Sequence, residues 1–325
     1  MKLPRRKFLH LTAAAAARPA VSRIAWAQSY PSRPVRLVVG YAPGGAGDIS
    51  ARLLGQWLSE RFGQQFIVEN RTGAGTNIAT ESVVRAAADG YTLLMSSAAN
   101  AINATLYDRL NFNFIRDTTP ISGILRVPHV IVVHPSFSAK TLPEFIAYAK
   151  ANPGKLTWAS PGVGTAGHVC GELFKMMAGL NMVHVPYRGG GAAMADLLSG
   201  QLQVYIGAMT SSLEYVKANR LRALAVSTAT RSEALPEVAR VSDFVPGFET
   251  SDWGGISGPK STPAEIIHKL NEEINAGLAD PKIKARLADL GGTPLTGSPT
   301  DFEALIAAET EKWAEVVKFA DIKPN

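Results

Sequence analysis

Four glycine-rich segments, each placed after an apolar stretch and before a helical pattern, contain residues that could bind an anion. They are Pro43–Asp48, Gly73–Asn77, Gly162–His168 and Arg188–Gly191. At the start of a helix, backbone N–H groups lack partners within the helix, and the helix dipole favours negative charge. Glycine lets the main chain approach a ligand because no Cβ stands in the way. For the first segment taken alone, an ordinary tight turn between strand and helix is an equally good interpretation.

Other kinds of site lack a complete set of residues. The pattern Gly162-x-Gly164-x-x-Gly167 matches a dinucleotide-binding motif, but no acidic residue lies between Glu172 and Asp196, where the ribose ligand is expected. The histidines show no metal-ligand spacing, and no pair of nucleophile and base stands out. We therefore expect no catalytic residue, no metal and no cofactor. An exported hydrolase or lyase stays open as a second hypothesis, because the members of a catalytic triad can be distant in sequence.

Two further side chains in this region have both a functional and a structural interpretation. His168 falls in the first turn of a predicted helix, where it either donates to a ligand carboxylate or caps the preceding loop. Cys170 is the single cysteine of the chain, so an intramolecular disulfide is excluded. It lies in the same predicted helix, and we expect it to be buried and inert because nothing nearby would lower the pKa of its thiol.

The N-terminus is expected to be an export signal covering residues 1–27. It contains six basic residues and no acidic one, with the twin-arginine pattern Arg5–Leu9, the apolar run Ala13–Ala17 and an A-x-A cleavage site at Ala25–Ala27. We predict cleavage and a periplasmic location, by either the Sec or the twin-arginine route; a cytosolic protein with a basic tail is the alternative. No run of about 20 apolar residues is present to span a membrane.

The net charge gives no indication of an acidic partner. The formal charge is +6, but the six basic residues of the signal account for all of it, which leaves 27 basic and 27 acidic residues. Aromatic residues are not interleaved with basic runs. Nucleic-acid binding is therefore disfavoured.

The elements that must position the glycine-rich segments alternate between strand and helix. We predict strands at Val35–Val39, Phe66–Glu69, Tyr91–Ser97, His129–His134, Leu156–Ser160, Met182–Tyr187, Gln203–Ala208 and Leu221–Ser227, and helices at Ile49–Phe62, Thr76–Ala87, His168–Met177 and Ala192–Leu198. Further helices are predicted to start at Thr141 and at capping boxes over Thr262–Glu265 and Thr300–Glu303. This alternation is typical of an α/β fold with largely parallel sheets, and the length of 325 residues suggests two domains.

Segments along the whole predicted mature chain resemble the Bug family, the periplasmic substrate-binding proteins of tripartite tricarboxylate transporters. The matching segments, in chain order, are Val39–Asp48, Val68–Gly75, Ala88–Leu94, Tyr148–Leu156, the loop ending at His168, His184–Gly191 and Leu221–Val226. Thr76 departs from the family pattern, which has glycine there.

The resemblance implies a two-domain Venus-flytrap fold, with the ligand in the cleft between the domains. Residues 28–126 plus 228–325 would form domain 1 and residues 127–227 domain 2, with chain crossings near Arg126 and Ser227. The implied ligand-binding residues come from both domains and are Tyr41, Ala42, Gly44, Gly45, Asp48, Ser97, Asn100, Gly164, Thr165, His168, Arg188 and Gly189.

The same resemblance implies a function without catalysis. A monomer would capture a small carboxylate for the membrane permease subunits of a tripartite tricarboxylate transporter; a sensor kinase is the alternative partner. Asp48 is expected to cap the helix start or hold the loop, because direct contact with an anion would be repulsive. Asp252, if it lies near the cleft, would disfavour a second ligand carboxylate and favour an amine or a hydroxyl.

Overall fold

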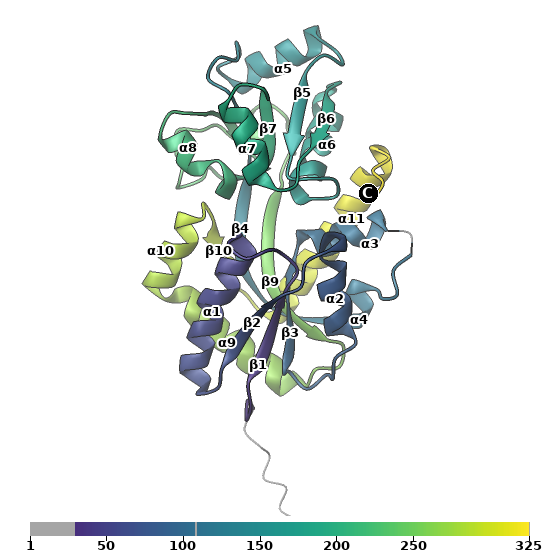
Figure 1. Ribbon diagram of the computed structural model, residues 1–325, viewed down its shortest axis with the longest axis vertical. Helices are drawn as coiled ribbons and strands as arrows, with labels where there is room; N and C mark the ends of the chain where they lie inside the picture. The colour runs from purple at the N-terminus through teal and green to yellow at the C-terminus, as the bar shows by residue number, and fades with distance from the viewer. Residues whose placement is uncertain (1–29, 108, 325) are drawn as a thin grey trace, which may run out of the picture. The chain divides into compact units, whose positions relative to one another are not determined.

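The computed structural model describes residues 30–107 and 109–324 (Figure 1). The predicted export signal, residues 1–27, lies outside the described residues. The chain from Arg33 onward forms one compact unit. In the described part of the chain, no helix combines the length and the apolar character needed to cross a membrane.

A mixed β-sheet runs through this unit in the strand order β2-β1-β3-β9-β4-β7-β5-β6, and β8 and β10 also pair with β4. The strands are β1 (Val35–Val39), β2 (Phe66–Asn70), β3 (Thr92–Ser97), β4 (Thr118–Val133), β5 (Thr157–Ser160), β6 (Val183–Pro186), β7 (Val204–Ala208), β8 (Arg222–Val226), β9 (Ser251–Pro259) and β10 (Thr293–Pro294). All eight predicted strands are therefore present, seven of them within a residue or two of the expected bounds.

The long strand β4 joins two halves of the sheet (Figure 1). It pairs with β9 as far as Pro128 and with β7 from His129 onward, antiparallel in both cases. The first half of the sheet contains the parallel strands β2, β1 and β3, and the second half contains the parallel strands β6, β5 and β7. The expectation of largely parallel sheets holds for these two sets of strands and is wrong for β4 and β9.

Strand β9 has no counterpart among the predicted strands, because its sequence lacks the apolar pattern of a buried strand. Its glycines replace side chains where other elements come close. A Cβ at Gly255 would lie 2.1 Å from the Phe302 ring, and a Cβ at Gly254 would lie 2.7 Å from the end of the Met95 side chain. Glycine at these positions therefore allows β9 to run between closely packed neighbours.

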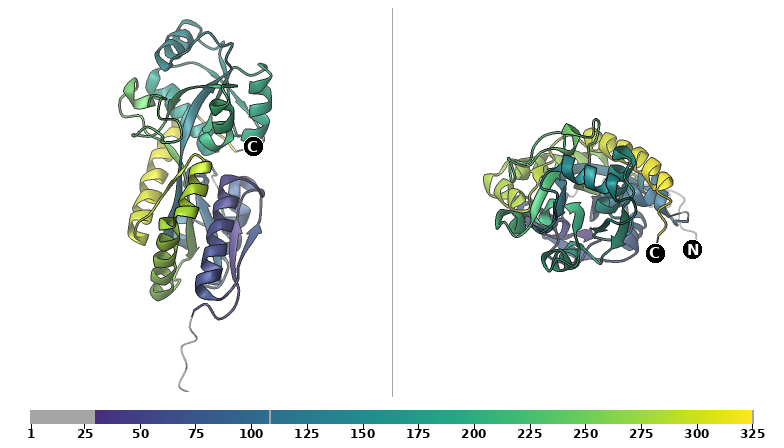
Figure 2. Two further views of the ribbon diagram at one scale, coloured as in Figure 1. Left: turned by 90° about the vertical axis from the view of Figure 1, so that its left-hand side faces the viewer. Right: turned by 90° about the horizontal axis from the view of Figure 1, so that it is seen from above.

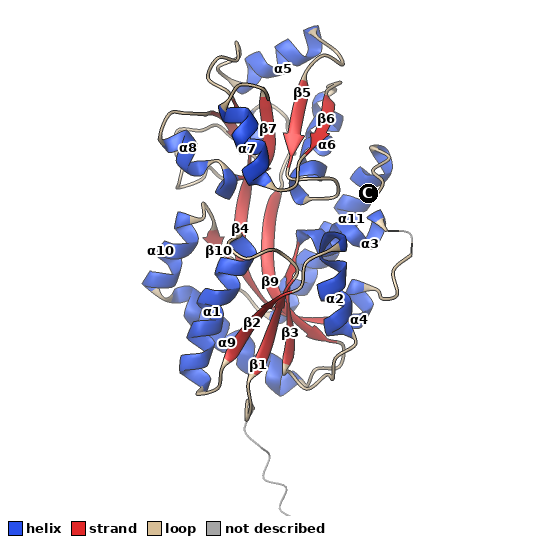
Figure 3. Ribbon diagram, in the orientation of Figure 1, coloured by secondary structure: helices blue, strands red, loops and turns tan. Residues whose placement is uncertain are grey.

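Helices cover both faces of the strands (Figure 3). They are α1 (Ala46–Phe62), α2 (Asn77–Val84), α3 (Ala98–Leu106), α4 (Phe114–Asp117), α5 (Leu142–Ala151), α6 (Ala166–Ala178), α7 (Gly190–Leu198), α8 (Leu213–Lys217), α9 (Ala264–Ala279), α10 (Pro281–Asp289) and α11 (Pro299–Phe319), with 3₁₀ turns η2 (Ala74–Thr76), η3 (Met209–Ser211) and η4 (Val241–Asp243). In the first half of the sheet, α1 packs beside α9, where the Trp57 Nε1 donates to the Glu273 carbonyl at 2.9 Å, and α11 packs against α3 (Figure 2).

Several helix starts differ from the predictions. Helix α1 begins at Ala46, three residues before the predicted start, because Gly45 is the last residue with an extended backbone (φ −80°, ψ 166°). Helix α7 likewise begins at Gly190, two residues early. Small residues occupy both starts, so apolar periodicity cannot reveal them.

Both predicted capping boxes in the C-terminal part are wrong. The Thr262 hydroxyl donates to the Pro259 carbonyl, and the N-cap of α9 is Pro263, without a side-chain cap. Helix α11 has its capping box two residues earlier than expected, between Ser298 and Asp301. Both sites offered several residues able to cap a helix, and spacing alone selected the wrong ones.

The turn before α2 contains Thr76, a position at which the resemblance implies glycine. Thr76 has a φ of +81°, in the left-handed region that favours glycine. Its side chain also packs closely on the main chain, since a Cβ at Gly40 would lie 2.6 Å from the Thr76 Cβ. Thr76 thus has a conformation that glycine would adopt more freely.

The core of the second half supports the helix that follows Gly162–His168. The aromatic side chains of Phe145, Phe174 and Phe248 form a chain of ring contacts and are fully buried. Cys170 is buried in α6 as expected, and its Sγ lies 3.2 Å from the Thr250 hydroxyl. Burial raises the pKa of this thiol to about 12, in agreement with the prediction of an inert cysteine.

Candidate ligand-binding site

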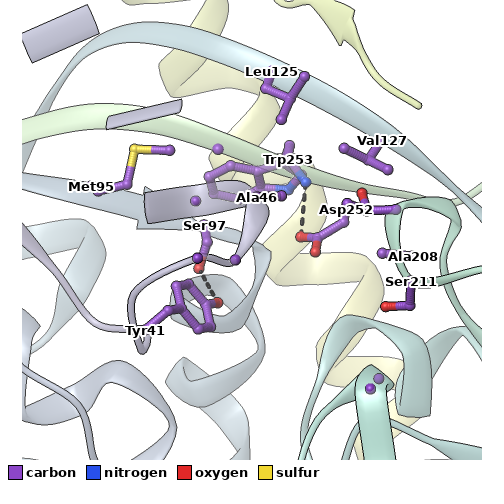
Figure 4. A pocket seen from close by; sticks show the side chains of 17 residues that line it. Tyr41, Ala46, Met95, Ser97, Leu125, Val127, Ala208, Ser211, Asp252 and Trp253 are labelled. Atoms are coloured by element: carbon purple, nitrogen blue, oxygen red, sulfur yellow. Dashed lines mark hydrogen bonds between the residues drawn. The ribbon is translucent and has the colours of Figure 1, made fainter. Parts of the chain in front are cut away.

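A cavity of about 430 Å³ lies where the two halves of the sheet meet (Figure 4). The Pro43–Asp48 segment and Ser97 border it from the first half, and the start of α7 and the turn η3 border it from the second half. The connecting strands β4 and β9 also contribute to its wall. Its lining residues are Tyr41, Gly44, Gly45, Ala46, Gly47, Met95, Ser97, Leu125, Val127, Gly190, Gly191, Ala208, Thr210, Ser211, Asp252, Trp253 and Gly254. We call it the first cavity.

A second cavity of about 250 Å³ shares Tyr41, Ala208 and Asp252 with the first. The two other predicted glycine-rich turns border it. Its remaining lining residues are Gly40, Gly73, Gly75, Thr76, Ala99, Asn103, Leu106, Tyr107, Pro161, Val163, Gly164, Thr165, Ala166 and Gly167. Because the cavities share three wall residues, we treat them as two parts of one cleft. All four predicted turns therefore border the same cleft.

Two helix starts border the first cavity without a side-chain cap. Gly45 is the N-cap of α1 and Gly189 is the N-cap of α7, and neither helix start receives a hydrogen bond from a capping side chain. Helix α6 differs, because the Thr165 hydroxyl accepts the N–H of His168 at 3.3 Å. Main-chain donors at the starts of α1 and α7 are thus free of side-chain competitors on the side that borders the first cavity.

Asp48 holds the loop before α1 and does not line either cavity. Its carboxylate accepts the Gly44 N–H at 2.9 Å, the Arg52 Nε at 3.0 Å and the Asn70 Nδ2 at 2.9 Å. Burial by itself would raise the pKa of Asp48, but these hydrogen bonds outweigh it and hold the pKa below its ordinary value. The carboxylate is therefore ionised at neutral pH and organises the loop, as expected from the sequence.

Asn100 positions the residues at the end of β3. Its Oδ1 accepts the Ser97 N–H at 2.8 Å, and its Nδ2 donates to the Thr80 hydroxyl at 2.7 Å. The Ser97 hydroxyl in turn lies 2.8 Å from the Tyr41 hydroxyl (Figure 4). Asn100 is buried, so it supports the Tyr41–Ser97 pair from behind the cavity wall.

His168 caps the loop that precedes α6. Its Nδ1 accepts the Gly164 N–H at 3.1 Å, and its ring stacks on His184 with centroids 3.9 Å apart. The Ser160 hydroxyl lies 2.7 Å from the His184 Nε2. Burial lowers the pKa of His168 to about 3 and that of His184 to about 4, so both rings are neutral at physiological pH. Of the two interpretations from the sequence, these contacts agree with the one in which His168 caps the preceding loop.

Asp252 is the one acidic residue that lines either cavity in the described chain, and no lysine, arginine or histidine lines them. It lies on β9 opposite Val127 of β4. The N–H of Trp253 donates to its Oδ1 at 2.9 Å. Protein atoms surround the carboxylate although a cavity reaches it, and this burial raises the pKa of Asp252 to about 6.

The predicted site residues divide into those that line the cleft and those that support it. Tyr41, Gly44, Gly45 and Ser97 line the first cavity, and Tyr41, Gly164 and Thr165 line the second. Ala42, Asp48, Asn100, His168, Arg188 and Gly189 line neither. A ligand-binding role for these twelve residues stays a prediction.

The sequence did not single out the turn η3 as part of the site. Thr210 and Ser211 line the first cavity immediately after β7. Ligands in α/β folds bind beyond the carboxyl ends of strands, so the predicted strand Gln203–Ala208 already indicated this position. In the described residues, no group of three or more His, Cys, Asp or Glu side chains is placed to hold a metal ion.

Known proteins resemble the chain over most of its length. The family model described as "Tripartite tricarboxylate transporter family receptor" matches residues 50–322. Protein BugT of Bordetella pertussis is 36% identical over 295 residues, which cover 90% of each chain. The structure of R. palustris Rpa4515 with adipate has a TM-score of 0.82 and 35% identity, covering 91% of this chain and 100% of that chain. The structure of MatC from Rhodopseudomonas palustris with bound malate has a TM-score of 0.78 and 27% identity, covering 89% and 100%.

Proposed function

Because the chain belongs to the tripartite tricarboxylate transporter receptor family, we propose that it is a periplasmic solute-binding protein that captures a small organic acid. Its fold is the two-domain periplasmic-binding-protein fold of these relatives. Two of the related structures contain dicarboxylates, adipate and malate, which supports an organic acid as the ligand class.

The observation that carries this proposal is the first cavity with its two uncapped helix starts. Gly45–Gly47 come from the first half of the sheet and Gly190–Gly191 from the second. Each start offers main-chain N–H groups and the positive end of a helix dipole, which favour an anion. A carboxylate between them would contact both halves, so its binding would favour a closed arrangement of the two domains.

The biological setting is part of the same proposal. The ligand would pass to the membrane permease subunits of a tripartite tricarboxylate transporter, and the chain would act as an exported monomer without catalytic activity. Transfer of a ligand signal to a sensor kinase is the alternative, and uptake or pull-down assays with the permease separate the two roles.

The division into domains also stays a proposal. The predicted crossing near Arg126 is supported by the change of partners of β4 at Pro128. Residues 228–250 contact the second half, through a bridge from Val226 to Arg240 and through Phe248 against Phe174. We therefore place the second crossing at Thr250/Ser251 instead of near Ser227.

The experiment is a thermal-shift titration of the mature protein with mono-, di- and tricarboxylates and amino acids. A ligand at 100 times its Kd stabilises the folded state by about 2.7 kcal/mol. Absence of a shift with every compound would contradict the proposal.

Substitution of Gly45 tests the position of the site. A Cβ there meets only the Ala42 carbonyl oxygen at 3.9 Å, so Gly45→Leu fits the backbone and fills the first cavity. We expect loss of the ligand-induced shift with little change in the melting temperature of the free protein. Ala307→Leu, on an exposed position of α11, is the matched control and should bind normally.

A further inference from the structure

Asp252 gives the cleft a charge that a dicarboxylate would not tolerate. It borders both cavities, and in the described chain no basic side chain lines either of them. The helix starts of α1 and α7 can hold one carboxylate. A second carboxylate on the same ligand would enter a cleft that already contains an acid and would find no cation there.

The Asp252 carboxylate also has acceptor capacity to spare. Within the described residues, the one hydrogen bond it receives is that from the Trp253 N–H. An ionised carboxylate can accept about four hydrogen bonds, so Asp252 can accept further hydrogen bonds from a ligand in the cavity. Figure 4 shows Asp252 between the Tyr41–Ser97 pair on one side and Ala208 and Ser211 on the other.

Tyr41 also favours a positively charged ligand group beside Asp252. Its hydroxyl is paired with Ser97, and its ring lines both cavities together with Asp252. An aromatic face attracts a cation through its quadrupole. An ammonium group beside Asp252 would therefore find a carboxylate, with an aromatic ring in the same cavity wall, whereas a carboxylate would be repelled by Asp252.

On the basis of the proposed function, we infer that the ligand is an amino acid: its carboxylate binds at the starts of α1 and α7, and its ammonium group pairs with Asp252. Asp252 is then the residue that determines specificity within the organic acids. This distinguishes the chain from the two relatives whose structures contain adipate and malate.

The inference predicts a pH dependence of opposite sign for the two ligand classes. The pKa of Asp252 is raised to about 6, mainly by burial and in part by the negative charge of Glu309 on α11. The other titratable groups that interact electrostatically with Asp252 are Tyr41 and Tyr205. None of these groups is basic. An amino acid needs the ionised carboxylate, so its affinity should fall about tenfold between pH 7.5 and pH 5. A dicarboxylate should bind better as Asp252 is protonated.

The test is calorimetric titration of the mature protein with ligands of matched length. The panel contains unbranched α- and ω-amino acids, dicarboxylates and plain monocarboxylates. We expect an amino acid to bind at least ten times more tightly than the dicarboxylate of the same length. Asp252→Asn should weaken that amino acid at least tenfold, strengthen the dicarboxylate and remove the pH dependence, whereas Asp252→Glu should keep the preference.

Each outcome decides between the two proposals. Tight dicarboxylate binding that Asp252→Asn leaves unchanged would overturn the inference and leave the proposed function intact. Absence of binding by every organic acid would overturn both. If the variants do not fold, the pH series on the unaltered protein still decides, because an affinity for the amino acid that does not fall below pH 6 contradicts a role for Asp252.

Discussion

Removal of the Asp48 side chain should reduce both the stability of the protein and its affinity for ligand. Asp48→Ala takes away the acceptor shared by Gly44, Arg52 and Asn70. Gly44 lines the first cavity, whereas Asp48 itself does not. The variant therefore loosens the loop without removing any group that lines the cavity.

The magnitude follows from the exposure of the partners. Hydrogen bonds to a charged group contribute about 1.5–3 kcal/mol each when they are shielded from water. The Arg52 side chain is 51% exposed while Asp48 is 2% exposed, so the ion pair itself contributes only about 0–1 kcal/mol. We expect the free energy of unfolding to fall by about 2–4 kcal/mol, mainly through the contacts of Gly44 and Asn70. In the variant, ligand binding must also order the loop. Every 1.4 kcal/mol of free energy that this ordering costs weakens the affinity about tenfold.

The assay combines urea denaturation with ligand titration, and two variants serve as controls. Asp89→Ala removes a similar pair of contacts, from the Tyr91 N–H and the Arg33 guanidinium, in an exposed turn outside both cavities. Arg52→Ala removes the ion pair and keeps the Gly44 contact. Both should lose about 1 kcal/mol or less and retain affinity. If Asp48→Ala loses stability but binds as tightly as the unaltered protein, the Asp48 contacts do not organise the site.

Two further predictions concern folding. Gly255→Ala should lower the free energy of unfolding by more than about 3 kcal/mol, as measured by equilibrium denaturation. Its Cβ would lie 2.1 Å from the Phe302 ring and 2.7 Å from the backbone carbonyl oxygen of Ser122. A smaller loss would show that β9 shifts to accommodate the methyl group. Burial lowers the pKa of His168 to about 3 and that of His184 to about 4, so below pH 6.5 the unfolded chain binds more protons than the folded one. The free energy of unfolding should therefore fall between pH 6.5 and about pH 4. His184→Gln should make this pH dependence weaker, as measured by urea denaturation.

The sequence predicted those parts of the fold and site that depend on local patterns. The run Val35–Val39 forms β1 with the predicted bounds, and α5 starts directly after Thr141, where a helix start was predicted. Both signals lie within a few neighbouring residues. The four glycine-rich segments that follow predicted strands could also be expected to border a common ligand site, because ligands bind beyond the carboxyl ends of strands in α/β sheets.

What the sequence could not predict depends on contacts between distant segments. Strand β9 contains glycines because Phe302 and Met95 occupy the space that side chains would need, and neither residue is near it in sequence. The support that Asn100 gives to Ser97 depends in the same way on Thr80. Apolar periodicity reports which face of an element is buried and carries no information on which distant residue covers it.

In the proposed site, the groups that bind the carboxylate differ from those that would discriminate among carboxylates. Main-chain donors of α1 and α7 come from the two halves of the sheet, and substitutions cannot easily alter them. Asp252 and its neighbour Val127 lie instead on the strands that connect the halves, where their side chains face the first cavity. A change of side chain on β4 or β9 therefore alters the charge and size of the cavity without moving either helix start. If the proposed site is right, a substitution at such a position would change specificity while the main-chain donors that bind the carboxylate are kept.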